Sequence, residues 1–319
     1  MNKNRWTRTL SAAAFLAVTT PAYAGVSIDR ASPSIGLCPF VVTPAHVYQQ
    51  VPPGGGCDVG GAGPQVEVRP ASFGLVAGDN IDALSANTAT PPNVPYHLVF
   101  SGGRGSLGQP GTPYRGEAVL NQAASDLWGT ALTSASPAAA MAACAAVVIP
   151  PPHVMFRRQI DFNLIFTAPT GAGPLAGVQD NIDAVELDVL DVTGDQFHDI
   201  GTYLSVDAAS PSLGARSTAD IFFVPPGGAG GIFAAFWQLG LVFADDVDAL
   251  VIWDRGGIGE LDPGMDLALF SLAPGSPSLG GSPADIFVTH FTGAFCLFAP
   301  ANQLGMRAAD NVDGLDVIP

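Results

Sequence analysis

Hydrophobic residues along this chain fall into short runs of four to eight positions, each bounded by Gly, Pro, Ser or Asp. Runs of this length and with these boundaries are typical of β-strands. One pattern of runs recurs, and its clearest copy is LGLVFADDVDALVIWD at 239–254. The other copies are FGLVAGDNIDALS (73–85), LAGVQDNIDAVELD (175–188) and LGMRAADNVDGLDV (304–317). We therefore interpret the chain as a repeat protein of four units.

Each copy carries an Asp at the same place, and these residues are Asp82, Asp183, Asp248 and Asp313. The last two intervals between them are both 65 residues, whereas the first is 101 residues. The second unit is therefore 36 residues longer than the others, and the insertion is placed at about residues 129–174.

Four strands are predicted in each unit. In the clearest unit they are VDALVIW (247–253), LALFSLAPG (267–275), ADIFVTHF (284–291) and the run into FCLFAPANQLGM (295–306). Ser-Pro-Ser sequences after the second strand suit a β-turn, because Pro fixes φ at the second turn position. Trp237 and Trp253 are interpreted as packing between neighbouring units.

The two ends of the chain are complementary. Residues 25–38 match the second strand of a unit, and the chain ends with a first strand in DNVDGLDVIP (310–319). Pairing these ends inside one sheet removes the exposed edges of an open array. The predicted fold is therefore all-β, a four-bladed β-propeller closed by its N- and C-terminal strands. A pair of β-sandwiches is the alternative, and it explains the repeat but not the complementary ends.

Residues 1–24 are predicted to be a signal peptide. The basic stretch MNKNRWTR precedes a short apolar core, and Ala22-Tyr23-Ala24 matches an A-x-A cleavage site. The apolar core is too short to span a bilayer. The chain is thus expected to be secreted or periplasmic, with a single domain at 25–319 and no membrane anchor after cleavage.

The net charge of the chain limits the classes of molecule that it is expected to bind. After removal of residues 1–24 the chain has nine basic residues, all Arg, against 28 acidic ones, a formal net charge of about −19. Nucleic acid and anionic lipid are not attracted to such a surface. A protein or glycan ligand is the expected partner, and the chain is expected to be a monomer.

The four Cys residues suggest two disulfides in an exported chain. Cys38 and Cys57 lie in one Pro/Gly-rich stretch and are the favoured local pair, which leaves Cys144 with Cys296. Free thiols are the alternative. Within the insertion, the Ala-rich run at 138–149 favours a short helix, and QIDFNLIFTAP (159–169) favours an additional strand.

Two units place a Gly-Leu turn before a strand that opens with Asp-Ala: Gly240-Leu241 with Val247-Asp248-Ala249, and Gly74-Leu75 with Ile81-Asp82-Ala83. This pattern resembles the hemopexin-like repeat, whose family builds a four-bladed propeller with Asp-Ala at the start of each innermost strand. The family's Tyr-Trp-Arg strand is absent from this sequence. The resemblance implies the number of blades and a cation in the central channel.

The repeated Asp residues are the candidate metal ligands: Asp82, Asp183, Asp248 and Asp313. If the first strands are innermost, four carboxylates meet at one height, where they repel one another unless their pKa values rise or a cation such as calcium neutralises them. In the alternative, each Asp caps a turn by accepting backbone N–H groups. The turn cap is favoured, because a cap needs only one unit to work.

No catalytic motif is recognised in the sequence. The five His residues share no metal-binding spacing, and GxSxG, P-loop and dinucleotide-binding patterns are absent. The sequence therefore favours a non-enzymatic binding or structural protein. A secreted hydrolase with an acidic active site in a propeller funnel is the alternative, in which Asp or Glu performs general acid/base catalysis.

Overall fold

The computed structural model describes residues 23–33, 47–49, 65–68, 70, 74–86, 97–121, 123–131, 155–161, 180–187, 201–225 and 228–318. In this part of the chain the fold is all-β, with four sheets of four antiparallel strands. Each sheet is named here by its first strand. From the first strand outward, the β16 sheet contains β16 (Val312–Ile318), β1 (Tyr23–Ile28), β2 (Val47–Gln49) and β3 (Gln65–Val68). The β4 sheet contains β4 (Ile81–Ala86), β5 (His97–Gly102), β6 (Asp126–Ala131) and β7 (Met155–Asp161), and the β8 sheet contains β8 (Ile182–Leu187), β9 (Thr202–Val206), β10 (Ile221–Val224) and β11 (Gly231–Ala234). The β12 sheet contains β12 (Val247–Trp253), β13 (Leu267–Leu272), β14 (Ile286–Thr289) and β15 (Phe295–Ala299).

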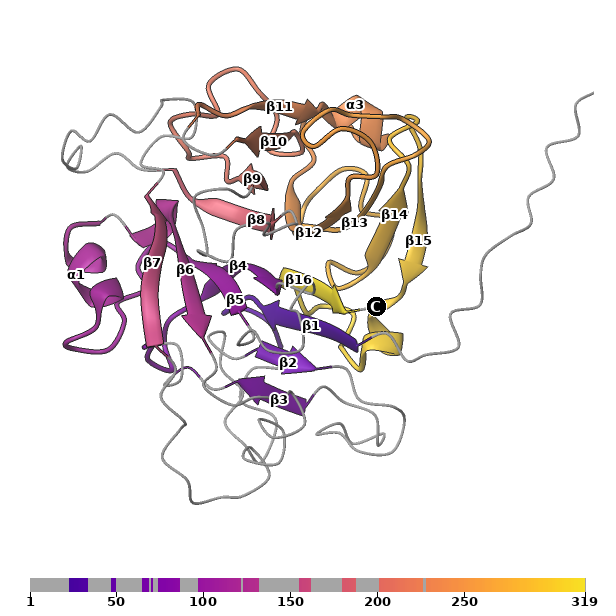
Figure 1. Ribbon diagram of the computed structural model, residues 1–319. Coiled ribbons are helices and arrows are strands. Elements are labelled where there is room, and N and C mark those ends of the chain that lie inside the picture. Colours follow the sequence, from indigo (N-terminus) through magenta and orange to yellow (C-terminus); the bar gives the residue numbers. More distant parts are fainter. Residues whose placement is uncertain are drawn as a thin grey trace, which may run out of the picture.

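The repeat units correspond to the sheets. Strands β12 to β15 coincide with the four runs expected in the clearest unit, and they pair in sequence order. The first strands β4, β8, β12 and β16 lie around the centre of the molecule, and the outer strands β3, β7, β11 and β15 lie at its periphery (Figure 1). The prediction of four-stranded units is therefore confirmed.

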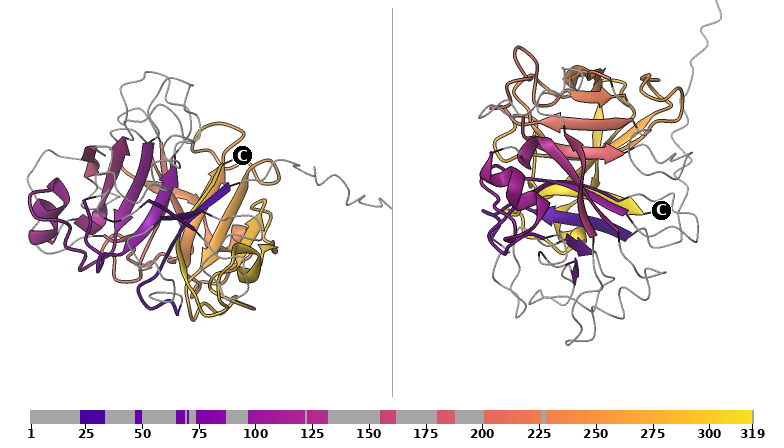
Figure 2. Two further views of the ribbon diagram at one scale, coloured as in Figure 1. Left: turned by 90° about the horizontal axis from the view of Figure 1, so that it is seen from below. Right: turned by 60° about the vertical axis from the view of Figure 1, so that its left-hand side comes forward.

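One sheet joins the two ends of the chain, as expected from their complementary patterns. β1 pairs antiparallel with β16, with Tyr23 opposite Ile318 and Val26 opposite Leu315. Figure 2 shows the indigo β1 beside the yellow β16. Residues 1–22 lie outside the described part of the chain, and cleavage after Ala24 would remove the first two residues of β1.

The first strands contact one another in a cycle. β4 contacts β8, β8 contacts β12, β12 contacts β16, and β16 contacts β4. Strands on opposite sides also approach, since β4 with β12 and β8 with β16 bring Cα atoms within 8 Å. The space that the four strands surround is therefore narrow at these points.

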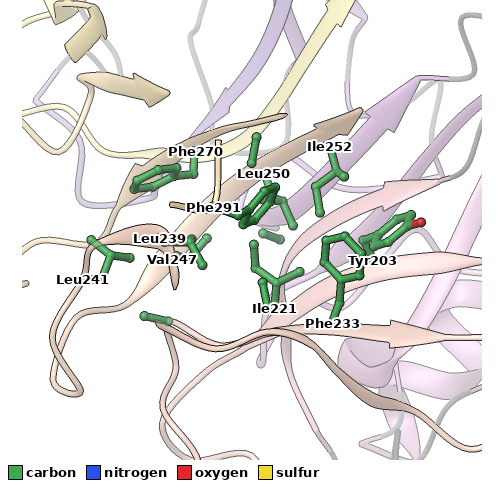
Figure 3. Close-up of a cluster of buried hydrophobic side chains, with 14 of the residues drawn as sticks. Tyr203, Ile221, Phe233, Leu239, Leu241, Val247, Leu250, Ile252, Phe270 and Phe291 are labelled. Carbon is green, nitrogen blue, oxygen red and sulfur yellow. The ribbon is translucent and has the colours of Figure 1, made fainter. Parts of the chain in front are cut away.

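Hydrophobic clusters fill the spaces between successive sheets. The largest lies between the β8 and β12 sheets, where Phe233 packs edge to face against Phe291 with ring centroids 5.7 Å apart. Figure 3 shows these rings with Leu250 and Ile221 among the surrounding side chains. Further clusters join the β12 sheet to the β16 sheet and the β4 sheet to the β8 sheet. Burial between sheets, rather than within each one, thus accounts for most of the core.

Buried serines on the second strands tie neighbouring sheets together. Ser27 Oγ donates to the carbonyl of Ile81 at 3.2 Å, and Ser205 Oγ donates to that of Val247 at 2.8 Å. Ser271 Oγ makes the equivalent bond to Val312, at 2.9 Å. In each case the accepting carbonyl belongs to the residue just before a repeated Asp. The fourth equivalent, Ser101, instead donates to Ala124 at 3.1 Å.

Short helices connect some strands: α1 (Pro113–Val119), α3 (Phe236–Leu239), η2 (Ala123–Ser125) and η3 (Ala301–Leu304). A glycine follows each of α3 and η3: Gly240, of the Gly-Leu turn, and Gly305, which precedes Met306. Gly240 and Gly305 have φ of 88° and 74°, a left-handed conformation that a side chain disfavours. No helix in the described residues has the length and apolarity needed to cross a membrane.

The unit that carries the insertion differs from the sequence prediction at its fourth strand. β7 spans Met155–Asp161 and pairs with β6, so it is the ordinary fourth strand of the β4 sheet. The strand predicted at 159–169 overlaps β7 at residues 159–161, where it is the fourth strand and not an additional one, and residues 162–169 lie outside the described residues. Part of the extra length lies between the third and fourth strands, where residues 132–154 connect β6 to β7 and only residues 290–294 connect β14 to β15. The predicted helix at 138–149 falls outside the described residues.

Two predictions about single side chains also change. Trp253 packs against the cluster between the β12 and β16 sheets, as expected, but Trp237 is 60% exposed and does not pack between sheets. Cys296 lies exposed on β15 as a free cysteine, so the structure does not support its pairing with Cys144. Cys38, Cys57 and Cys144 lie outside the described residues.

The burial of the C-terminal strand generates a test with a matched pair of substitutions. Leu315 on β16 is 1% exposed, whereas Leu297 on β15 is 53% exposed. Leu315→Ala is expected to lower the free energy of unfolding by about 2–5 kcal/mol, because it leaves a cavity between sheets. Leu297→Ala is expected to change it by less than about 0.5 kcal/mol. Urea denaturation measures both values, and equal effects would contradict the placement of β16 in the core.

Candidate functional site: a ring of Asp and Asn side chains

A β-bulge places each of the four repeated Asp residues. In the β12 sheet Val247 pairs with Leu272 and Ala249 pairs with Ser271, so Asp248 has no partner across the ladder. The same irregularity falls at the other three positions: Asp82, Asp183 and Asp313. A bulge leaves its extra residue unpaired and redirects the side chain. The four Asp side chains thus share one local geometry, set by the backbone.

The residue two positions before each repeated Asp is Asn80, Asn181, Asp246 or Asn311, and a serine holds its backbone. Ser106 Oγ accepts from the N–H of Asn80 at 2.8 Å, and Ser210 Oγ does the same for Asn181 at 2.8 Å. Ser276 and Ser32 make the equivalent bonds to Asp246 and Asn311, at 3.1 Å and 2.9 Å. Three of these serines belong to the Ser-Pro-Ser turns of the repeat.

Turn capping is performed by a different set of aspartates, which lie three residues before the repeated Asp in each unit. Asp79 accepts from the backbone N–H of Val76 at 2.8 Å, and Asp245 accepts from that of Val242 at 2.7 Å. Asp310 accepts from Arg307 at 2.7 Å in the same way. The turn-cap role proposed for the repeated Asp therefore belongs to these neighbours. Their equivalent in the fourth unit, Asp180, accepts from the backbone N–H of Ser212 at 2.9 Å, in the turn after β9.

Asn side chains connect the repeated Asp residues across neighbouring sheets. The Nδ2 group of Asn181 donates to Asp183 of its own unit at 2.9 Å and to Asp82 of the preceding unit at 3.1 Å. Asn80 likewise donates to Asp82 and, at 2.9 Å, to Asp313.

Asn311 makes the third bridge, to Asp313 at 2.7 Å and to Asp248 at 2.5 Å. The structure thus brings all four predicted residues together. Carboxylates and amides alternate through three of the four units, and we call this set of eight side chains the Asp/Asn ring.

The fourth bridging position holds an acid. Asp246 takes the place of the Asn, between Asp183 and Asp248, and a carboxylate has no N–H group to donate to either one. Its Oδ1 atom is buried and has no hydrogen-bond partner among the described residues. Three carboxyl groups therefore follow one another at this point, and the alternation of donor and acceptor stops.

Burial raises the pKa of every carboxyl group in the Asp/Asn ring. For Asp82 the pKa rises to about 6, because burial outweighs the hydrogen bonds from Asn181 and Asn80 that lower it. The pKa of Asp246 also rises to about 6, chiefly through burial, although a hydrogen bond with Thr218 lowers it. The pKa values of Asp183, Asp248 and Asp313 rise well above the usual range, first through burial and then through neighbouring acids.

Within the described residues, no three His, Cys, Asp or Glu side chains form a group that could hold a metal ion by themselves. The repeated Asp carboxylates already accept hydrogen bonds from Asn amides, so any cation at this place has to share the site with these bonds. The aspartates of the third strands are structural, since Asp220 and Asp285 accept backbone N–H groups from Phe236 and Ala301, each at 2.8 Å.

Sequence reasoning missed the bridging residues Asn80, Asn181 and Asn311 and the acid at Asp246. Their signal was present in the repeated Asp-Asn pairs and in the single Asp245-Asp246 pair. The bonds that give them a role join residues such as Asn80 and Asp313, which are far apart in the sequence. No protein-family model and no curated protein sequence matches this chain.

The raised pKa values predict an unusual dependence of stability on pH. A buried Asp whose folded-state pKa exceeds its unfolded value of about 3.9 binds its proton more tightly in the folded chain, so stability falls as pH rises through that interval. With chelator present, the melting temperature is expected to fall from about pH 4 to about pH 7. Asp82 and Asp246, with pKa values of about 6, set the middle of this transition.

The matched control is Glu260→Gln, which removes one exposed acid from the loop between β12 and β13 and should leave this slope unchanged. A melting temperature that rises steadily from about pH 4 to about pH 7, as in proteins stabilised by ionised carboxylates, would contradict the raised pKa values.

Proposed function

We propose that this chain is an exported, non-enzymatic binding or structural protein built on a four-bladed β-propeller, with a cation in its central channel. The four sheets are the blades, and the sheet that contains β1 and β16 closes the ring. Two observations support this arrangement: the cycle of contacts among the first strands, and the pairing of the two terminal strands.

The observation that carries the proposal is the near equivalence of the four units at the Asp/Asn ring. A general acid and a general base need unlike environments to separate their pKa values. Here Asp82, Asp183, Asp248 and Asp313 all lie at the same bulge, and all have raised pKa values with burial as the main cause. A ring of similar carboxylates on a shared axis favours a structural cation over catalysis.

Calcium is the cation proposed for this place. It is a hard ion that takes six to eight oxygen ligands in irregular geometry, and carboxylates, amide oxygens and water all suit it. The positive charge of the ion would offset the repulsion among Asp82, Asp183, Asp248 and Asp313, which raise one another's pKa values through their charges. Binding would thereby fix the first strands of all four sheets relative to one another.

Exposed hydrophobic residues supply surfaces where a protein or glycan ligand could bind. Trp237 and Phe243 are 60% and 56% exposed near α3, and Leu297 and Phe298 are 53% and 50% exposed on β15. Exposed aromatic groups are common in such binding surfaces. Export through residues 1–24 places the mature chain in the periplasm or outside the cell, where calcium is available as a structural ion.

A secreted hydrolase is the alternative, and the asymmetry at Asp246 is the observation that favours it. This acid breaks the equivalence of the four units, and its pKa of about 6 suits proton transfer near neutral pH. A panel of hydrolase substrates separates the two proposals. Turnover that a single substitution in the ring abolishes would overturn the non-enzymatic assignment, and absence of turnover on every substrate class would support it.

Calcium is expected to raise the melting temperature of the purified protein. At a free concentration a hundredfold above the dissociation constant, one site adds about 2.7 kcal/mol of stability. The double variant Asp183→Asn/Asp248→Asn should lose this stabilisation, because two ring charges are removed. Magnesium and sodium at matched ionic strength control for screening. An unchanged melting temperature on adding calcium after chelation would refute the cation.

A further inference from the structure

Three buried asparagine side-chain oxygens have no hydrogen-bond partner in the part of the chain that the structure describes: Asn80 Oδ1, Asn181 Oδ1 and Asn311 Oδ1. These asparagines are only 8%, 5% and 8% exposed. A buried acceptor without a donor is costly, at about 1–3 kcal/mol for each group. The same orphaned atom therefore recurs in three units, and in the fourth unit its counterpart is the unpartnered Oδ1 of Asp246.

The hydrogen bonds of the ring fix the direction of these amides. Each Nδ2 group faces two carboxylates, and only the N–H end of an amide can do so. The oxygen at the other end of the amide must face away from those carboxylates. Each of the four bridging residues stands directly before a first strand, and these strands contact one another in a cycle, with opposite strands within 8 Å. The bridging positions therefore surround one narrow space.

Any species that satisfies these four oxygens must interact with the lone pairs of several of them at once. A single water molecule donates two hydrogen bonds and leaves two of four acceptors unsatisfied. A cation can contact all four, because each of them is an amide carbonyl or carboxylate oxygen. The ring carboxylates Asp82, Asp183, Asp248 and Asp313 then form a second layer of negative charge around it, and the amides hold that layer in place.

We propose that Asn80, Asn181, Asn311 and Asp246 bind one calcium ion directly through their Oδ1 atoms, while the four repeated Asp residues remain hydrogen-bonded to the asparagine amides. This inference rests on the proposed propeller and its central cation, and it assigns the ligands. Water completes the coordination along the axis. Three neutral oxygens and one anionic oxygen form the direct ligand set.

The acid at position 246 has a specific role in this site. An Asn there would complete the alternation of the ring by donating to Asp183 and Asp248, so the apo protein would be more stable with Asn than with Asp. Asp246 makes neither of those hydrogen bonds, and instead supplies a negatively charged ligand to the cation. Magnesium fits poorly, because it requires near-ideal octahedral geometry and retains its water, whereas calcium tolerates a set fixed by the surrounding strands.

The test compares wild type with Asp246→Asn, and Glu260→Gln serves as the matched control that removes one acid elsewhere. Calcium affinity is measured by isothermal titration, and melting temperature is measured with calcium and with chelator. Asp246→Asn is expected to bind calcium at least about tenfold more weakly, because the only anionic ligand is lost. In chelator it should melt above wild type, because the ring of hydrogen bonds is then complete. Glu260→Gln should match wild type in both measurements.

A second variant, Asp246→Ala, removes the ligand and adds no donor, so it should lose calcium affinity without the gain in chelator. If Asp246→Asn keeps the affinity of wild type while Asp183→Asn/Asp248→Asn loses it, the repeated Asp residues are the direct ligands. That result overturns this assignment but preserves the cation. If wild type itself binds no calcium, both the assignment and the proposed cation are wrong.

Discussion

Five carboxyl groups lie buried or half-buried where the four first strands meet, and the rest of the structure has to offset their mutual repulsion. Part of this repulsion is offset because acids and amides alternate. Each Asn donates two N–H hydrogen bonds, one to an Asp of its own sheet and one to an Asp of a neighbouring sheet. The amides therefore act between units rather than within them. A sheet that moved away from its neighbours would break these bonds and leave buried carboxylates without donors, so electrostatics and sheet packing depend on each other.

Local sequence prepares this arrangement in every unit. A bulge turns the repeated Asp inward, the serine of the following turn fixes the backbone of the bridging residue, and the preceding Asp caps the loop. A further serine ties the adjacent carbonyl to the next sheet in three of the four units. Several polar residues in each unit thus serve one geometric purpose, and this explains why the polar positions repeat as clearly as the hydrophobic ones.

The strands and their grouping could be predicted, because period, turn residues and repetition are local signals. The convergence of the four Asp residues also followed from the repeat. The bridging role of Asn181 did not, since it depends on Asp82 of another sheet, and no local pattern encodes that contact. Asp246 resembled its neighbours in the sequence, yet loss of the amide changes the hydrogen bonding of the whole ring. Trp237 was misplaced because size and apolarity indicate burial only on average.

The sheet shared by the chain ends has a consequence for how the protein folds. β1 begins at Tyr23, whereas its partner β16 begins at Val312, so the other three sheets lie between them in the sequence. Until β16 is in place, the edge of β1 that faces it stays open, and the Asp/Asn ring lacks Asn311 and Asp313. Contacts of such long range fold slowly, because the chain has to close a very large loop before they form. Closure of this one sheet therefore completes the core and the Asp/Asn ring in the same late step.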